Sequence, residues 1–331
     1  MIEWKIPFAK PQVPLNEDMV EEIVALISEG QVSNGEFCRQ VEEEVQRISG
    51  ADQAIVCSSC TQGLIIALAG SRVAAQSKNG QNTVGFTQSF TWDSTAIAIN
   101  ASGCPLYYLD IDYDNWMVKN YPAARGPAFA LAVDTFGMQF NVEAQVPVFY
   151  DRAHSIGVHF RQLGLASVMS FSPSKLVTGG EGGVILTNRP KFAEAFIKAR
   201  DMMSRMTEVS AVMILGGLRK LDDVLEWKLD TFNRYKKAFP DFQFQEGTGN
   251  HAVIGMLVDT NKQREQIMAY TEANGVELKA YYRPLHMGDP TYDWAGRLPV
   301  TEDVGNRIIC LPSWYGVDRD AVVEAIRKAI E

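Results

Sequence analysis

The sequence lacks the features that mark secreted or membrane-spanning proteins. It has only five cysteines in 331 residues, an odd number, which argues against a disulfide framework and favours reduced thiols in the cytosol. The N-terminus carries charged residues where a signal peptide needs an apolar stretch. No uninterrupted apolar run approaches the ~20 residues of a membrane span. We therefore expect a cytoplasmic protein that does not partner a membrane.

An excess of positive charge is also missing. The chain has 31 Lys and Arg against 40 Asp and Glu, a formal net charge of −9, so we expect no general affinity for nucleic acid. Hydrophobic residues make up 46% and charged residues 21%, which excludes a disordered chain. At ~150 residues a domain, two domains with sizeable cores are expected, and neither disulfides nor a metal is needed to hold them.

Helical and extended patterns alternate along the first two thirds of the chain. Apolar residues at helical spacing predict two helices within residues 15–48. From residue 54, short apolar runs alternate with helix-like stretches, which predicts a mainly parallel sheet covered on both faces. Because only a glycine-rich segment separates the last two runs, we expect one antiparallel strand at an edge. The runs are 54–57, 83–86, 105–109, 129–133, 146–150, 167–171 and 183–186.

The last third of the chain has a different pattern. Residues 207–239 predict one long helix or two, and after Pro240 apolar runs follow at 252–258, 276–281 and 308–311, before a final helix. We predict a large domain of residues 1–240, including the N-terminal helical segment, and a smaller α+β domain of residues 241–331.

The segment Ser170-Phe-Ser-Pro-Ser-Lys175 is the most informative one. An isolated lysine is usually a surface residue. Lys175, however, follows a predicted strand and leads into glycine-rich backbone up to Gly183, which can turn sharply and approach a bound group closely. A lysine held in such a place can lose its hydration and become a nucleophile for carbonyl chemistry.

The segment Val148-Phe-Tyr-Asp-Arg-Ala-His154 supplies a carboxylate. Asp151 follows a predicted buried strand, at the edge where open α/β sheets bind their ligands. A helix cap is an equally good interpretation of this residue. In the functional interpretation, the Asp151 carboxylate is a partner for the ring nitrogen of pyridoxal phosphate. His154 alone would more often be a structural histidine than a catalyst.

Two further segments complete the chemistry. Residues 57–64, Cys-Ser-Ser-Cys-Thr-Gln-Gly-Leu, form a strand-to-helix junction that can bind an anion, although a plain helix cap is the simpler interpretation. Trp92 lies in a loop after a strand and could pack in the core or stack on a flat ring. Together the four segments provide a nucleophilic lysine, an acidic ring partner, a phosphate cradle and a stacking aromatic.

On these residues the chain resembles the DegT-type (StrS-like) sugar aminotransferases, pyridoxal-phosphate (PLP) enzymes of fold type I. The resemblance implies an α/β fold with a mainly parallel seven-stranded sheet and a smaller C-terminal α+β domain. It implies that Lys175 is the catalytic Schiff-base lysine, Asp151 the partner of the ring nitrogen and His154 a neighbour of the ring hydroxyl. The implied cofactor-binding residues are Ser59, Cys60, Thr61, Trp92, Asp151, His154, Ser170 and Lys175.

The resemblance also implies a reaction. Segment 30–35 resembles the family's N-terminal substrate loop and segment 284–286 a motif of the small domain, so Asn34 and His286 are implied substrate residues. Arg205-Met-Thr-Glu208 resembles the motif that opens the family's long helix. The implied activity moves an amino group from glutamate to a keto sugar, most often nucleotide-linked, with the aminated cofactor (PMP) as intermediate. The implied assembly is a homodimer with its active sites at the interface.

The sequence departs from the family pattern at three places. Cys60 stands where glycine is usual, and Leu176 where an asparagine commonly follows the lysine. The largest departure is the stretch 188–205, where family members carry a long insertion that reaches the neighbouring subunit. Met203 takes the place of an asparagine that touches the neighbour's cofactor phosphate, so we expect that contact to be lost.

Two other functions stay open at this stage. Some relatives are PLP-dependent sugar dehydratases in which a histidine replaces the lysine, and Lys175 argues against that chemistry. A cofactor-binding or sensory protein with little turnover is suggested by the missing insertion.

Overall fold

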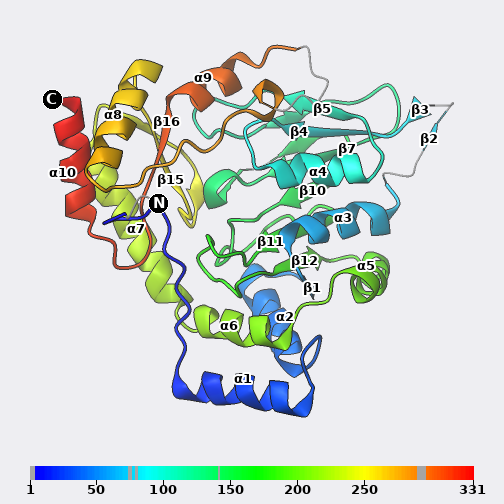
Figure 1. Ribbon diagram of the computed structural model, residues 1–331. Helices are drawn as coiled ribbons and strands as arrows, with labels where there is room; N and C mark the ends of the chain where they lie inside the picture. Colours follow the sequence, from blue (N-terminus) through cyan, green and yellow to red (C-terminus); the bar gives the residue numbers. More distant parts are fainter. Residues whose placement is uncertain (1–3, 74–76, 79–80, 141, 289–295) are drawn as a thin grey trace.

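The computed structural model describes residues 4–73, 77–78, 81–140, 142–288 and 296–331. A seven-stranded sheet forms the centre of the larger part of the molecule, and a three-stranded sheet with its own helices lies beside it (Figure 1). Among the helices described, none is both long and apolar enough to cross a membrane.

The large sheet has the strand order β1-β12-β11-β10-β7-β4-β5, and neighbours from β11 to β5 run parallel. This confirms the predicted mainly parallel sheet. The predicted antiparallel strand exists, and it is β12. Its predicted position at the edge of the sheet is wrong, because β12 pairs with β11 along one side and with β1 along the other. The strands are β1 (Gln53–Cys57), β4 (Val84–Gln88), β5 (Leu106–Leu109), β7 (Ala128–Val133), β10 (Val148–Asp151), β11 (Ala166–Ser170) and β12 (Gly183–Thr187).

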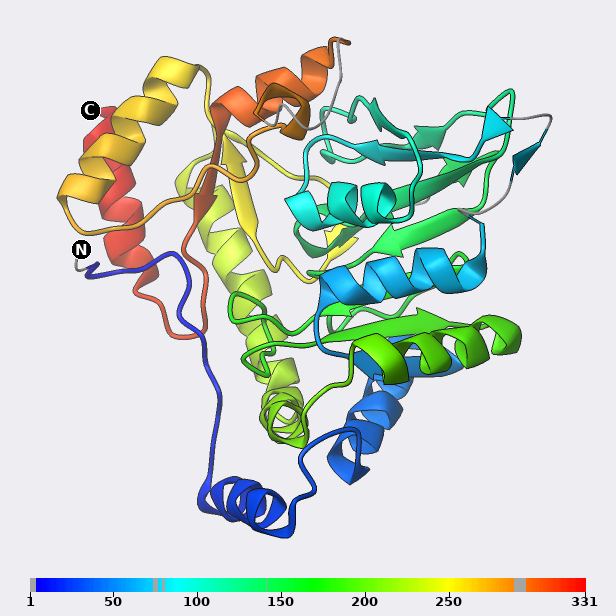
Figure 2. The ribbon, with the colours of Figure 1, turned by 45° about the vertical axis from the view of Figure 1, so that its right-hand side comes forward.

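Helices cover the two faces of this sheet unequally. α3 (Cys60–Ser71), α4 (Asp93–Ala101) and α5 (Pro190–Met203) lie side by side on one face (Figure 2). On the second face α2 (Glu36–Ser49) packs on β1, with α6 (Glu208–Leu218) beside it and α1 (Glu17–Glu29) outermost.

The predicted alternation of strands with helix-like stretches is wrong for three connections. Within the described residues, no α-helix joins β5 to β7, β7 to β10, or β10 to β11. These connections contain only β6 (Asn120–Tyr121), a 3-10 turn η1 (Thr135–Gly137), β8 (Met138–Gln139) and β9 (Glu143–Ala144). The second face therefore has no crossover helix over β10.

The predicted helical region 207–239 is two helices, α6 and α7 (Leu221–Ala238), and α7 leads to the smaller sheet. That sheet has the order β13-β15-β16, and α8 and α10 pack together beside it. The predicted strand 276–281 forms only isolated bridges, from Val276 to Ile6 and from Lys279 to Cys310. The remaining elements are β2 (Ser77–Lys78), β3 (Gln81–Asn82), β13 (Gln243–Phe244), β14 (Thr248–Gly249), β15 (Ile254–Leu257), α8 (Asn261–Ala273), η2 (Leu285–Met287), α9 (Pro299–Arg307), β16 (Ile308–Leu311) and α10 (Arg319–Ile330).

Glu208, at the start of α6, joins two helix N-termini. Its carboxylate is buried and accepts hydrogen bonds from the backbone N–H groups of Gly35 (2.7 Å), Phe37 (2.8 Å) and Cys38 (3.2 Å) at the start of α2. A negative charge at this end of a helix is stabilised by the helix dipole. The motif Arg205–Glu208 thus has a structural role, since it holds α2 and the loop before it against α6.

We expect Glu208→Ala to lower the free energy of unfolding by about 3 kcal/mol or more, because three N–H groups lose their acceptor in a buried place. Urea unfolding followed by circular dichroism measures this change. Glu43→Ala, at an exposed position on α2, is the matched control and should change stability by no more than about 0.5 kcal/mol. Equal effects of the two substitutions would contradict the role of Glu208.

Candidate active site

A pocket of about 300 Å³ lies at the carboxyl ends of β10 and β11, against the N-terminus of α3. Parallel strands end at the same edge of a sheet, which is where α/β proteins bind ligands. The structure brings all the predicted cofactor-binding residues to this one pocket. They are Ser59, Cys60, Thr61, Trp92, Asp151, His154, Ser170 and Lys175. Their roles there stay predictions.

Asp151 ends β10 and is buried, with 4% of its surface exposed. One carboxylate oxygen accepts a hydrogen bond from the Thr95 hydroxyl (2.6 Å) and the other from the backbone N–H of Ala153 (3.1 Å). Burial raises the pKa of Asp151, while the bond from Thr95 acts in the opposite direction. Both donors are neutral, so a cationic group placed against this carboxylate would be strongly stabilised.

Lys175 lies in the loop between β11 and β12, with its backbone N–H bonded to the carbonyl of Ser172 (3.0 Å). Its Nζ is 2.7 Å from Nε2 of His154. Burial lowers the pKa of Lys175, and burial together with the nearby lysine lowers the pKa of His154 well below its usual value. A neutral His154 can accept a hydrogen bond from Lys175, and a lysine with a lowered pKa is a better nucleophile.

The N-terminus of α3 forms one wall of the pocket. Ser59 caps this helix by accepting a hydrogen bond from the backbone N–H of Gln62 (3.2 Å). The first N–H groups of a helix have no acceptor within it and attract anions such as phosphate. A Cβ atom on Gly183 of β12 would lie 2.6 Å from the backbone nitrogen of Cys60. Glycine at this position therefore allows the strand to approach the helix end closely.

Aromatic side chains form the open side of the pocket. Trp92 caps the start of α4 and is 58% exposed. Its ring centroid lies 6.3 Å from that of Tyr281 and 6.5 Å from that of Tyr282, two further residues of the lining. Sequence reasoning missed both tyrosines, because it included Tyr281 in a strand. It also missed Thr95, which stands one helical turn after Thr91 and bonds to it (3.0 Å).

The residues present fit a pyridoxal-phosphate cofactor. The pocket combines a buried carboxylate for the ring nitrogen, an amine for the aldehyde carbon, an exposed indole for the ring face and a helix N-terminus for the phosphate. The buried carboxylate of Asp151 has only neutral donors, which is the strongest indication of a cationic ring nitrogen beside it.

The two predicted substrate residues lie outside the lining of this pocket. Asn34 has a left-handed backbone (φ 54°) and donates its N–H to the carbonyl of Met206. His286 is buried, with Nδ1 2.7 Å from the Ser89 hydroxyl and Nε2 3.5 Å from a carboxylate oxygen of Glu302. Their substrate roles stay predictions.

The fold is shared with solved structures, at least one of which is an aminotransferase. PseC of Helicobacter pylori, an aminotransferase involved in the biosynthesis of pseudoaminic acid, gives a TM-score of 0.85 at 17% identity over 98% of both chains. DesI, solved in the presence of its TDP-sugar product, gives 0.83 at 20% identity over 98% of this chain and 93% of its own. NtdA of Bacillus subtilis with bound PMP gives a TM-score of 0.82 at 20% identity, over 98% of this chain and 85% of the NtdA chain.

The family model described as the DegT/DnrJ/EryC1/StrS aminotransferase family matches residues 14–329. This range includes the whole candidate active site and every strand of the seven-stranded and three-stranded sheets. The chain therefore belongs to the DegT/DnrJ/EryC1/StrS family of PLP-dependent aminotransferases.

Proposed function

We propose that this enzyme transfers an amino group from glutamate to a keto sugar that carries a nucleotide. The observation that carries the proposal is the presence of Lys175 and the buried Asp151 in one pocket. An amine that can move a proton and a carboxylate that can keep a ring nitrogen protonated are the two groups that transamination requires. Bound PLP supplies the electron sink for the negative charge that develops on the substrate carbon.

In this proposal Lys175 is the general base and acid. Its Nζ takes a proton from the α-carbon of the donor and, in the second half-reaction, returns one to the carbon of the acceptor. His154 receives a hydrogen bond from the same nitrogen and orients it (2.7 Å). Asp151, held by Thr95 and Ala153, would hold the ring nitrogen of bound PLP and stabilise its positive charge.

A second pocket supports a nucleotide-linked acceptor. Its volume is about 400 Å³, it adjoins the first through Trp92, Tyr281 and Tyr282, and it includes Arg283. Aromatic faces can stack on a nucleobase, and an arginine can pair with a diphosphate. The structure of DesI with its TDP-sugar product shows that a protein of this fold accommodates such a ligand.

We further propose that the protein is a cytoplasmic homodimer, divided into residues 1–240 and 241–331. α1 leaves three apolar side chains about half exposed at spacings of a helical face: Val20 (48%), Val24 (58%) and Ile27 (59%). Such a patch marks a contact surface, and closed two-fold dimers are the commonest oligomers.

The glutamate half-reaction is the direct test of the function. With purified, PLP-loaded protein we expect glutamate to bleach the yellow absorption of the lysine-bound cofactor and to release 2-oxoglutarate. We expect Lys175→Ala to lack that absorption and to form no product, since the base is missing. Yellow protein that no amino donor bleaches would support the sensory alternative. Loss of a sugar hydroxyl without nitrogen transfer would support a dehydratase.

Asp151→Asn keeps the shape of the side chain but removes its charge. We expect the variant to bind PLP and to lose activity by about 100-fold or more, because the charge on the ring nitrogen matters most in the transition state. Single-turnover kinetics with glutamate measure this loss. Turnover at the wild-type rate would contradict the role of Asp151.

Met203 allows a test of the missing contact to the neighbouring subunit. α5 runs straight from Pro190 to Met203, and the Met203 side chain is 56% exposed. A charge-assisted hydrogen bond to phosphate is worth roughly 1.5–3 kcal/mol, so Met203→Asn should bind PLP about ten- to a hundredfold more tightly. Equilibrium dialysis measures the change. An unchanged dissociation constant would show that Met203 does not stand near the cofactor phosphate.

The homodimer predicts one species of twice the chain mass in sedimentation equilibrium at micromolar concentration. Val24→Glu places a charge in the exposed face of α1, and we expect it to shift the equilibrium toward monomer, whereas Glu21→Gln on the same helix should not. A fully active wild-type monomer would refute this part of the proposal.

A further inference from the structure

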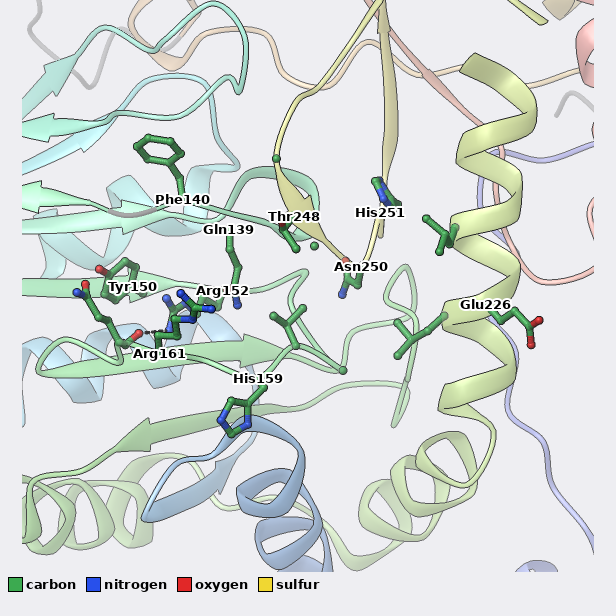
Figure 3. Close-up of a pocket in the computed structure, with 17 residues that line it drawn as sticks. Gln139, Phe140, Tyr150, Arg152, His159, Arg161, Glu226, Thr248, Asn250 and His251 are labelled. Atoms are coloured by element: carbon green, nitrogen blue, oxygen red, sulfur yellow. Dashed lines mark hydrogen bonds between the residues drawn. The ribbon is translucent and has the colours of Figure 1, made fainter. Parts of the chain in front are cut away.

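A wide cavity lies on the second face of the large sheet, where no crossover helix among the described residues covers β10. Its volume is about 910 Å³, and we call it the rear groove. β10, the loop 157–162, β8, β14 and α7 surround it (Figure 3). We propose that the rear groove binds a small organic anion, with a carboxylate or phosphate group on an apolar body, at a site distinct from the cofactor pocket.

A buried arginine forms part of the wall of the rear groove. Arg152 is stacked between the rings of Tyr150 (4.1 Å) and Phe160 (4.0 Å), and its side chain is 5% exposed. Its Nε donates to Asp134 (2.8 Å), and its Nη1 donates to the carbonyl of Gln162 (2.7 Å) and to a serine hydroxyl. Among the described residues Nη2 has no such partner, so this nitrogen can donate to a ligand.

An unpaired amide lies in the same wall. Nε2 of Gln139 is buried and has no hydrogen-bond partner within the described part of the chain. Figure 3 shows the Gln139 side chain extending from its strand toward Arg152. A buried donor without an acceptor destabilises the empty protein, and a ligand oxygen would satisfy it.

The charge around the groove favours an anion. Arg161 adds an exposed guanidinium to the lining, and Arg152 is paired with Asp134. The Glu226 carboxylate points away from the cavity (Figure 3). His251 is neutral near pH 7, because burial and Lys228 lower its pKa to about 4.

The opposite side of the rear groove is apolar. α7 contributes Leu225 and Leu229, of which Leu229 is 51% exposed. On the side of Gln139, Phe140 adds a ring that is 36% exposed (Figure 3). A ligand with only a charged group would leave these side chains in water. An aromatic or aliphatic body beside the anionic group would cover them and match both walls.

The rear groove is also linked to the catalytic lysine. Asn250 lines it, and its amide nitrogen donates to the backbone carbonyls of His154 (2.6 Å) and Ile156 (2.8 Å). His154 in turn contacts Nζ of Lys175. A ligand that displaces Asn250 would therefore change the position of His154, so the site is placed to regulate the proposed reaction.

Isothermal titration calorimetry with the PLP-loaded protein tests the proposal without any turnover. The probes are phenyl phosphate and benzoate, which combine an anion with an aromatic body, and benzyl alcohol and inorganic phosphate, which each lack one part. We expect one molecule of phenyl phosphate or benzoate to bind per chain, and whichever of the two binds identifies the anionic group. We expect benzyl alcohol not to bind and inorganic phosphate to bind more weakly.

Four variants locate the bound probe. Arg161→Gln and Gln139→Leu should each weaken binding by about tenfold, whereas Arg219→Gln, an exposed arginine elsewhere, should bind like wild type. Gln139→Leu should also raise the unfolding temperature of the ligand-free protein, since it removes the unpaired amide. Arg283→Gln changes a residue at the mouth of the cofactor pocket, so weaker binding by this variant would show that the probe binds there.

Two results would overturn the proposal. One is the absence of binding by both aromatic anions at millimolar concentration. The other is binding that Arg283→Gln weakens while Arg161→Gln and Gln139→Leu do not, which would place the anion at the mouth of the cofactor pocket.

Discussion

The burial of the Asp151 carboxylate at the carboxyl end of β10 is the constraint on which the active site depends. Moving a carboxylate from water into a protein interior costs several kcal/mol, and the two neutral donors at Asp151 offset only part of this. The same pocket raises the pKa of Asp151 and lowers that of Lys175, so each charge is disfavoured without a partner. A cofactor with a cationic ring nitrogen would pair with the Asp151 carboxylate, and its aldehyde would react with the neutral amine of Lys175, so one ligand suits both groups.

The alternation of side chains along β10 connects this pocket with the rear groove. Asp151 faces the side of the sheet that α3 covers, and Tyr150 and Arg152, its neighbours in sequence, face the other side. One strand end therefore supplies the proposed partner of the ring nitrogen and the arginine of the proposed anion site. Because no crossover helix among the described residues covers β10 on the second face, the buried Arg152 borders the rear groove there.

The sequence was sufficient for most of the strands and for bringing the predicted cofactor-binding residues to one pocket, because polar or glycine-rich segments follow the apolar runs at the sheet edge. It could not place β12 inside the sheet, since strand order depends on pairing between residues such as Val56 and Val184 that are far apart in the chain. Thr95 was missed because a threonine in a helix has no distinctive pattern. The rear groove was missed because the sequence pattern predicted helices between the strands, whereas three connections contain no α-helix within the described residues.

Reduction of the PLP-loaded protein with borohydride, followed by peptide mass mapping, tests most directly whether Lys175 is the residue that holds the cofactor. Reduction makes the link between cofactor and lysine permanent, so its place in the chain can be read. The account predicts that the cofactor is found on the peptide that contains Lys175. Lys10 and Lys228 line a small cavity that also includes Lys175. Cofactor on either of those lysines, or on none, would contradict the account.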